Sequence, residues 1–129
     1  MGLLGKILVC VGTIGLGTFL ASKIAEYNRI EEERQNTPCY FSGKLTINDF
    51  YTIVRNHTKH IKRLTVFMDG PVVNGVVRSQ SGRSTWCFKI DFNDFGEITG
   101  KYWLHNENRD SYIPKTIAEF IKQDIEKRL

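Results

Sequence analysis

The chain has 129 residues and a formal net charge of +4. This length excludes a large multidomain enzyme and leaves room for one small domain with a modest core. Three cysteines and three histidines, with neither a C-x-x-C nor an H-x-x-x-H spacing, exclude a disulfide framework and a typical zinc site. We therefore expect no metal ion and no cofactor.

The amino-terminal region contains an uncharged, mostly apolar run between Lys6 and Lys23. With the flanking leucines and with lysines that reach toward the head groups, residues 3–24 suffice for a helix across a hydrocarbon core of about 30 Å. We therefore predict a single-pass membrane anchor over residues 1–25, with the membrane as a partner of the chain. A cleaved signal peptide is the open alternative and would make the protein secreted, but no A-x-A site follows the run.

The residues after the apolar run divide into a stalk and a domain. Residues 26–37 are highly charged and predict a juxtamembrane helix, and residues 38–129 predict one α+β domain. More basic residues follow the run than precede it, which favours a cytoplasmic domain. The predicted domain holds 14 Lys and Arg against 10 Asp and Glu, which is the whole net charge of the chain.

Two amphipathic helices are predicted at the ends of the domain. Thr46 is the expected N-cap of the first, with Asp49 three residues later completing a capping box. Pro114 is expected in the first turn of the last helix. Apolar residues at helical spacing are expected to face the core. They are Ile47, Phe50, Tyr51, Val54 and Ile61 in the first helix and Ile117, Phe120, Ile121 and Ile125 in the last.

Four stretches with period-two alternation lie between the helices, at residues 62–69, 72–79, 84–92 and 97–105. Tight turns between them predict that Leu64 lies opposite Val77, Val77 opposite Trp86, and Trp86 opposite Leu104. The turns then agree in placing one apolar set on the same face, toward the helices. The set is Leu64, Val66, Met68, Val73, Val77, Trp86, Phe88, Ile90, Phe92, Ile98, Tyr102 and Leu104.

These elements predict an α+β fold: an N-terminal hydrophobic helix followed by a small α-β-β-β-β-α domain. Its four-stranded antiparallel meander carries two helices on one face.

The opposite face of the predicted sheet carries apolar residues that an exposed surface does not need. In the predicted register Thr65, Val76, Cys87 and Trp103 form one row across the four strands. Such a row is a candidate patch for a protein partner or a second copy of the chain. The predicted partner-binding residues are Phe67, Val76, Cys87, Trp103, Lys89 and Lys101. The open alternative is that the stalk or the loop at Cys39 covers this row.

A basic segment over residues 55–63, at the end of the first predicted helix and with His57 and His60 among its cations, is the other unusual feature. Arg55, Lys59, Lys62 and Arg63 are the residues predicted to bind anionic lipid head groups. The alternative is a solvated helix end, because the helix dipole favours cations there. Nucleic acid is disfavoured as a partner, because the strand order lacks the alternating helices of the commonest RNA-binding sheet domain.

No arrangement of nucleophile, base and orienting group typical of catalysis stands out in the sequence. Cys39 and Cys87 are candidates for a disulfide only if the domain is exported. The sequence therefore favours a membrane-tethered, non-enzymatic module that binds a protein partner or itself through the exposed face of the sheet.

Overall fold

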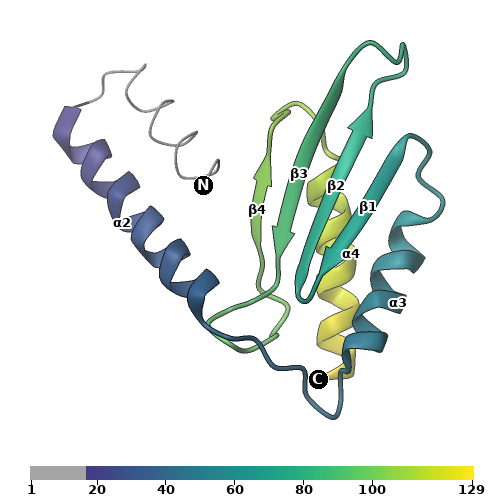
Figure 1. Cartoon of the computed structure of the whole chain (residues 1–129), viewed down its shortest axis with the longest axis horizontal. Coiled ribbons are helices and arrows are strands. Elements are labelled where there is room, and N and C mark those ends of the chain that lie inside the picture. Colours follow the sequence, from purple (N-terminus) through teal and green to yellow (C-terminus); the bar gives the residue numbers. More distant parts are fainter. Residues whose placement is uncertain (1–16) are drawn as a thin grey trace. The chain divides into compact units, whose positions relative to one another are not determined.

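The computed structural model describes residues 17–129. Its elements, drawn in Figure 1, are α2 (Gly17–Asn36), α3 (Ile47–Thr58), β1 (Leu64–Asp69), β2 (Val72–Arg78), β3 (Thr85–Asp91), β4 (Trp103–Asn106) and α4 (Ile113–Arg128). The chain divides after Pro38 into two compact units. The predicted membrane anchor lies largely outside the described residues, and no helix within residues 17–129 combines the length and apolar character needed to cross a bilayer.

The helix α2 runs through the predicted stalk, residues 26–37, as far as Asn36. On its exposed surface Arg29 Nη1 lies 3.4 Å from Glu33 Oε2, one helical turn away. At its carboxyl end the hydroxyl of Thr37 donates to the carbonyl oxygen of Glu33 (2.8 Å). Pro38 follows, and proline is common just beyond a helix end because it cannot continue the helix.

The unit that begins at Cys39 is an antiparallel sheet with two helices. Its strands lie in the order β1-β2-β3-β4, and α3 and α4 lie on the same face of the sheet (Figure 1). This arrangement confirms the predicted α+β meander. The first two predicted turns are also confirmed, because Leu64 pairs with Val77 and Val77 pairs with Trp86.

The third predicted pairing is wrong. Leu104 pairs with Ile90 and not with Trp86, so the β3–β4 register is shifted by four positions along β3. Because the shift is an even number of residues, Leu104 stays on the face that we predicted. The predicted strand over residues 97–105 shrinks to β4, which begins at Trp103.

The turn after β3 explains this difference. Asp94 and Glu97 exchange backbone hydrogen bonds of 3.1 and 3.2 Å, which close a two-residue turn. The predicted pairing of Trp86 with Leu104 would have required a three-residue loop. Phe95 and Gly96 both have positive φ, 53° and 92°, as the mirror-image hairpin turns require. Gly100 then takes a φ of 96°, and the chain rejoins the ladder only after it.

The core lies between the sheet and the two helices. All twelve strand residues predicted to face inward belong to it or pack against it. Phe50 of α3 contacts Phe92 edge to face, with ring centroids 5.7 Å apart. Three helix predictions need correction. Ile47 is 39% exposed in the first helical turn, and Phe120 is 48% exposed on α4. Ile61 packs against the core but lies beyond the end of α3.

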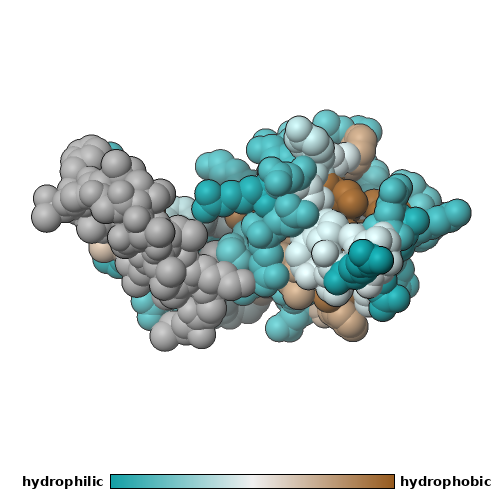
Figure 2. Space-filling model, turned by 90° about the horizontal axis from the view of Figure 1, so that it is seen from above, coloured by the Kyte–Doolittle hydropathy of each residue, from teal (hydrophilic) through white to brown (hydrophobic). Residues whose placement is uncertain are grey.

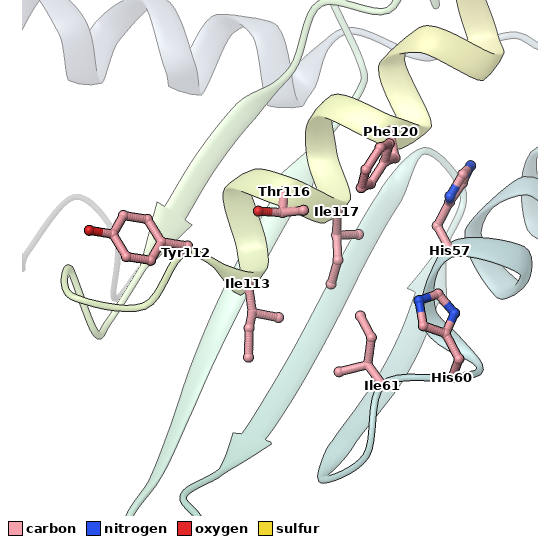
Figure 3. Close-up of a pocket in the computed structure, with 8 residues that line it drawn as sticks. All are labelled: His57, His60, Ile61, Tyr112, Ile113, Thr116, Ile117 and Phe120. Atoms are coloured by element: carbon pink, nitrogen blue, oxygen red, sulfur yellow. The ribbon is translucent and has the colours of Figure 1, made fainter.

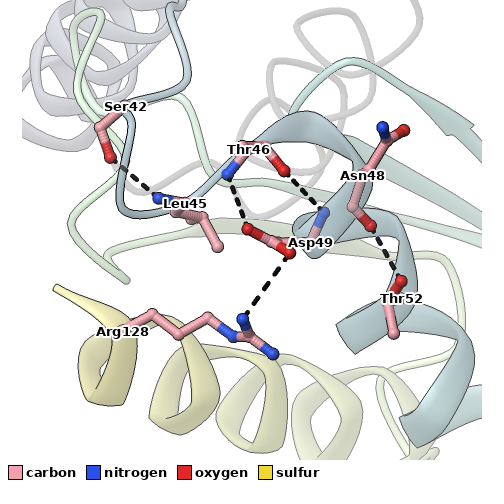
Figure 4. Close-up of polar contacts among 7 residues, drawn as sticks. All are labelled: Ser42, Leu45, Thr46, Asn48, Asp49, Thr52 and Arg128. Carbon is pink, nitrogen blue, oxygen red and sulfur yellow. Dashed lines mark hydrogen bonds and ion pairs between the residues drawn. The ribbon is translucent and has the colours of Figure 1, made fainter.

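The amino end of α3 is held by a capping box (Figure 4). The Asp49 N–H donates to Thr46 Oγ1, and the Thr46 N–H donates to Asp49 Oδ2, both at 3.1 Å. Arg128 Nη1 lies 3.7 Å from the other oxygen of the same carboxylate. Asp49 therefore connects the start of α3 to the end of α4. The sequence predicted the capping box but not the contact with Arg128.

Candidate interaction surfaces

The sheet face opposite the helices, here called the outer face, carries the residues predicted to bind a partner. Thr65 pairs with Val76 and Val76 with Cys87, so three members of the predicted row lie side by side. The fourth position belongs to Glu107, whose N–H donates to the Cys87 carbonyl oxygen (3.1 Å). The placement of Trp103 in this row was therefore wrong.

Trp103 instead pairs with Asp91, at the other end of β3. It lies on an edge strand, and Phe67 lies on the opposite edge strand, β1. Three strand spacings separate the two edges, which is roughly 14 Å. Phe67 is 59% exposed, whereas Trp103 is partly buried. The predicted patch therefore divides into two, and Phe67 is the more accessible aromatic side chain.

The two lysines of the predicted patch are also separated. Lys89 is partly buried between its strand neighbours Asn74 and His105, in the row that begins with Phe67. Lys101 lies outside the sheet, in the segment before β4, where its Nζ is 3.9 Å from Asp94 Oδ2. Only Lys89 can border a partner that binds over Phe67.

The two described cysteines are free and differ in their exposure to solvent. Cys87 is exposed on the outer face, and Cys39 packs partly buried against the core. Burial raises the pKa of the Cys39 thiol, and the nearby Asp91 carboxylate raises it further. In this fold the two thiols are not joined, so the disulfide considered for an exported domain is not formed.

The residues predicted to bind lipid, Arg55, Lys59, Lys62 and Arg63, are all exposed. Arg63 has a φ of 67°, which is uncommon for a residue with a side chain. Its carbonyl oxygen accepts the N–H of Arg78 (2.9 Å), so Arg63, just before β1, lies directly opposite Arg78 at the end of β2.

These two arginines border a hollow of about 290 Å³ that is also lined by Thr65 and Thr85. Like charges directly opposite on neighbouring strands are unfavourable. Within residues 17–129 neither guanidinium forms an ion pair. The predicted lipid-binding set contains Arg63 but not Arg78, although the predicted and confirmed pairing of Leu64 with Val77 already places Arg78 opposite Arg63.

A pocket of about 420 Å³ between the end of α3 and the start of α4 was not predicted. Figure 2 views this end of the domain, where hydrophobic residues show between hydrophilic ones. Figure 3 shows Ile61, Ile113 and Ile117 around a common space, with the His57 ring beside Phe120. Residues far apart in sequence form this pocket, so helical periodicity alone could not reveal it.

His57 joins the two helices at the pocket. Its Nε2 contacts Asp124 Oδ2 of α4, and its ring stacks on Phe120 with centroids 5.5 Å apart and planes 8° from parallel. In the sequence, His57 belongs to the basic segment over residues 55–63, for which a solvated helix end was the alternative interpretation. Its acidic partner lies 67 residues away in the sequence, which no local pattern could indicate.

Metal-binding chemistry has no support in this part of the chain: among residues 17–129, no three His, Cys, Asp or Glu side chains cluster closely enough to hold an ion. Comparison with protein-family models, curated proteins and solved structures gave no match.

Proposed function

We propose that this chain is a membrane-tethered, non-enzymatic interaction module whose outer face binds another protein or a second copy of itself. The exposure of Phe67 supports this proposal most directly. More than half of this aromatic side chain, 59%, is open to solvent on a sheet face that neither α3 nor α4 covers (Figure 1). Buried aromatic side chains supply much of the energy of protein interfaces.

In this mechanism Phe67 and the adjoining row of Val76 and Cys87 are buried against the partner. The partly buried Lys89 borders the contact. The predicted anchor over residues 3–24 holds the domain at the bilayer. Tethering raises the effective concentration of the domain for partners in the same membrane, so a small patch is sufficient for binding.

The test is chemical crosslinking of the full-length protein in membranes, with Phe67→Ser as the variant. Phe120→Ser is the matched control, because Phe120 is similarly exposed at 48% but lies on the helix side of the sheet. We expect Phe67→Ser to remove the crosslinked species and Phe120→Ser to retain them. Trp103→Ala is expected to have the smaller effect, since Trp103 is partly buried at the other edge. Unchanged crosslinking by Phe67→Ser would exclude the mechanism.

A second candidate function, binding of anionic lipid head groups, is supported by Arg63 and Arg78. Their opposed guanidinium groups and the hydroxyls of Thr65 and Thr85 around one hollow suit a phosphate oxyanion. A photocrosslinking phospholipid with an anionic head group, reconstituted with the full-length protein, tests this. We expect Arg63→Ala and Arg78→Ala to lower labelling several-fold and a neutral probe to label all variants equally. The site would be excluded if the extent of labelling were the same for anionic and neutral probes and for all three proteins.

A further inference from the structure

The strand β1 forms a free edge of the sheet. Because the Arg78 N–H donates to the Arg63 carbonyl oxygen, alternate residues from Arg63 onward bond inward to β2. The intervening residues Leu64, Val66 and Met68 therefore direct their N–H and C=O groups away from the sheet. Within residues 17–129 no other strand pairs with this edge.

This edge lacks the features that usually keep sheet edges apart. Proteins protect such strands with proline, inward-pointing charges, bulges or very short strands. The six residues of β1, Leu-Thr-Val-Phe-Met-Asp, contain no proline, and their only charge is at the end. The inner-face residues Leu64, Val66 and Met68 are only partly buried, whereas Val73 and Val77 on the adjacent strand are 0% and 2% exposed. The apolar layer is therefore incompletely covered at β1.

The sequence of β1 is complementary to itself. In an antiparallel pair centred on Val66, this residue meets its own copy, and Leu64 meets Met68 on the inner face. On the outer face Thr65 meets Phe67. Arg63 of each copy then meets Asp69 of the other, at non-hydrogen-bonded positions, where side chains lie closest. The outward-pointing backbone groups of residues 64, 66 and 68 are the ones that this register uses.

We propose that two copies of this chain pair along β1 in this register and form one continuous sheet across a two-fold axis. Each Arg63–Asp69 contact occurs twice, as an interface of this symmetry requires. The inference goes beyond binding by the outer face, because it depends on the backbone edge of β1. Tethering both copies to one membrane would favour the pairing.

The first experiment is disulfide trapping in membranes. It uses the full-length protein with Cys10, Cys39 and Cys87 replaced by serine and with Val66→Cys added. Paired residues at the centre of the register have Cα atoms about 5.5 Å apart, within the range that a disulfide spans. We expect a disulfide-linked dimer after mild oxidation. Lys115→Cys in the same background is the matched control, and we expect it to remain monomeric because Lys115 is exposed on α4, which packs against β3 and β4.

The second experiment reverses charges in the Val66→Cys background. Arg63→Asp alone or Asp69→Arg alone places two like-charged pairs across the interface, and each should lower the trapped dimer about tenfold. The double variant Arg63→Asp/Asp69→Arg should restore it. Arg83→Asp, which changes an exposed cation in the turn between β2 and β3, should leave trapping unchanged. Residues 63 and 69 lie about 20 Å apart within one strand, so rescue by the double variant identifies a contact between copies.

The third experiment separates loss of pairing from loss of folding. Val66→Pro removes an N–H that points outward, so no hydrogen bond within the domain is lost, and proline is accepted on edge strands. Crosslinking of this variant with an amine-reactive reagent should show only the monomer. Its circular dichroism spectrum should be the same as that of the natural sequence. The edge proposal is wrong if Val66→Cys gives no more dimer than Lys115→Cys, or if the double charge variant does not restore trapping. The proposed outer-face function is tested separately, by the loss of other crosslinked proteins in Phe67→Ser.

Discussion

Gly75 shows how a single residue limits the packing of the sheet. It lies on β2 opposite Phe88, on the inner face. A Cβ atom added at Gly75 would lie 2.1 Å from the Phe88 ring, which is itself 2% exposed and cannot move into solvent. Alternation in the sequence predicts the direction of residue 75 but not the ring that covers it. The missing side chain at Gly75 is therefore a packing requirement that the tertiary structure imposes.

We predict that Gly75→Ala lowers the free energy of unfolding by about 2 kcal/mol, because the buried ring must leave its rotamer or shift the strands. Gly43→Ala is the control, since no atom lies within 4 Å of its added Cβ, and it should change stability by less than about 0.5 kcal/mol. Urea unfolding of the full-length protein in mild detergent, followed by tryptophan fluorescence, measures both. The double variant Gly75→Ala/Phe88→Leu should lose less than the sum of the two single changes. Strict additivity would show that the two side chains do not compete for space.

Among the elements, the helices and the first three strands could be predicted because local signals determine them. The Thr46 cap, Pro114 and period-two alternation are read directly from neighbouring residues. The start of β4 could not be predicted, because it depends on the positive φ of Phe95 and Gly100. A glycine allows that conformation without requiring it, and a phenylalanine gives no hint of it. The wrong placement of Trp103 beside Cys87 follows from the wrong prediction of this one turn.

The capping box of α3 gives a prediction at the same scale. Thr46→Ala removes the acceptor for the Asp49 N–H (Figure 4) and should cost about 1 kcal/mol of stability. Thr52→Ala, on the exposed side of the same helix, is the control and should cost less than about 0.5 kcal/mol. Thermal unfolding by circular dichroism distinguishes them. If Thr46→Ala and Thr52→Ala lowered the stability equally, the cap at Thr46 would contribute no more than an exposed threonine elsewhere in α3.

The capping box also has a pH dependence with a definite sign. Hydrogen bonds from the Thr46 backbone and side chain, with a smaller effect of Arg128, hold the pKa of Asp49 below its usual value. A lowered pKa in the folded state stabilises the fold above the usual carboxyl pKa of about 3.9. The contribution is lost as the pH falls through the lowered pKa. The stability difference between the Thr46→Ala variant and the natural sequence should therefore narrow in acid.

For the whole domain, Tyr102 and Glu119 connect the segment before β4 to α4. The Tyr102 hydroxyl donates to Glu119 Oε1 at 2.5 Å. Burial, and then the bond to Glu119 and its negative charge, raise the pKa of Tyr102 to about 12. Because the folded state holds this proton more tightly than the unfolded chain, the stabilisation is present below about pH 10 and is lost between about pH 10 and 12.

Tyr102→Phe should therefore be less stable than the natural sequence near neutral pH, by about 1 kcal/mol for a partly exposed bond to a carboxylate. The difference should shrink at about pH 11, where the natural tyrosine begins to lose its proton on unfolding. Urea unfolding of both proteins at the two pH values measures this. A difference that stays constant across the range would show that the hydroxyl proton is not held by the fold.

The position of α4 after all four strands in the chain has a consequence for synthesis in the cell. The core is completed by four buried residues of α4, which follows all four strands in the chain: Ile117, Ala118, Ile121 and Ile125. A nascent chain at the ribosome can form the three hairpins before α4 covers its part of their inner face. Until α4 has been synthesised, the sheet is thus a folding intermediate whose apolar inner face is open to chaperones.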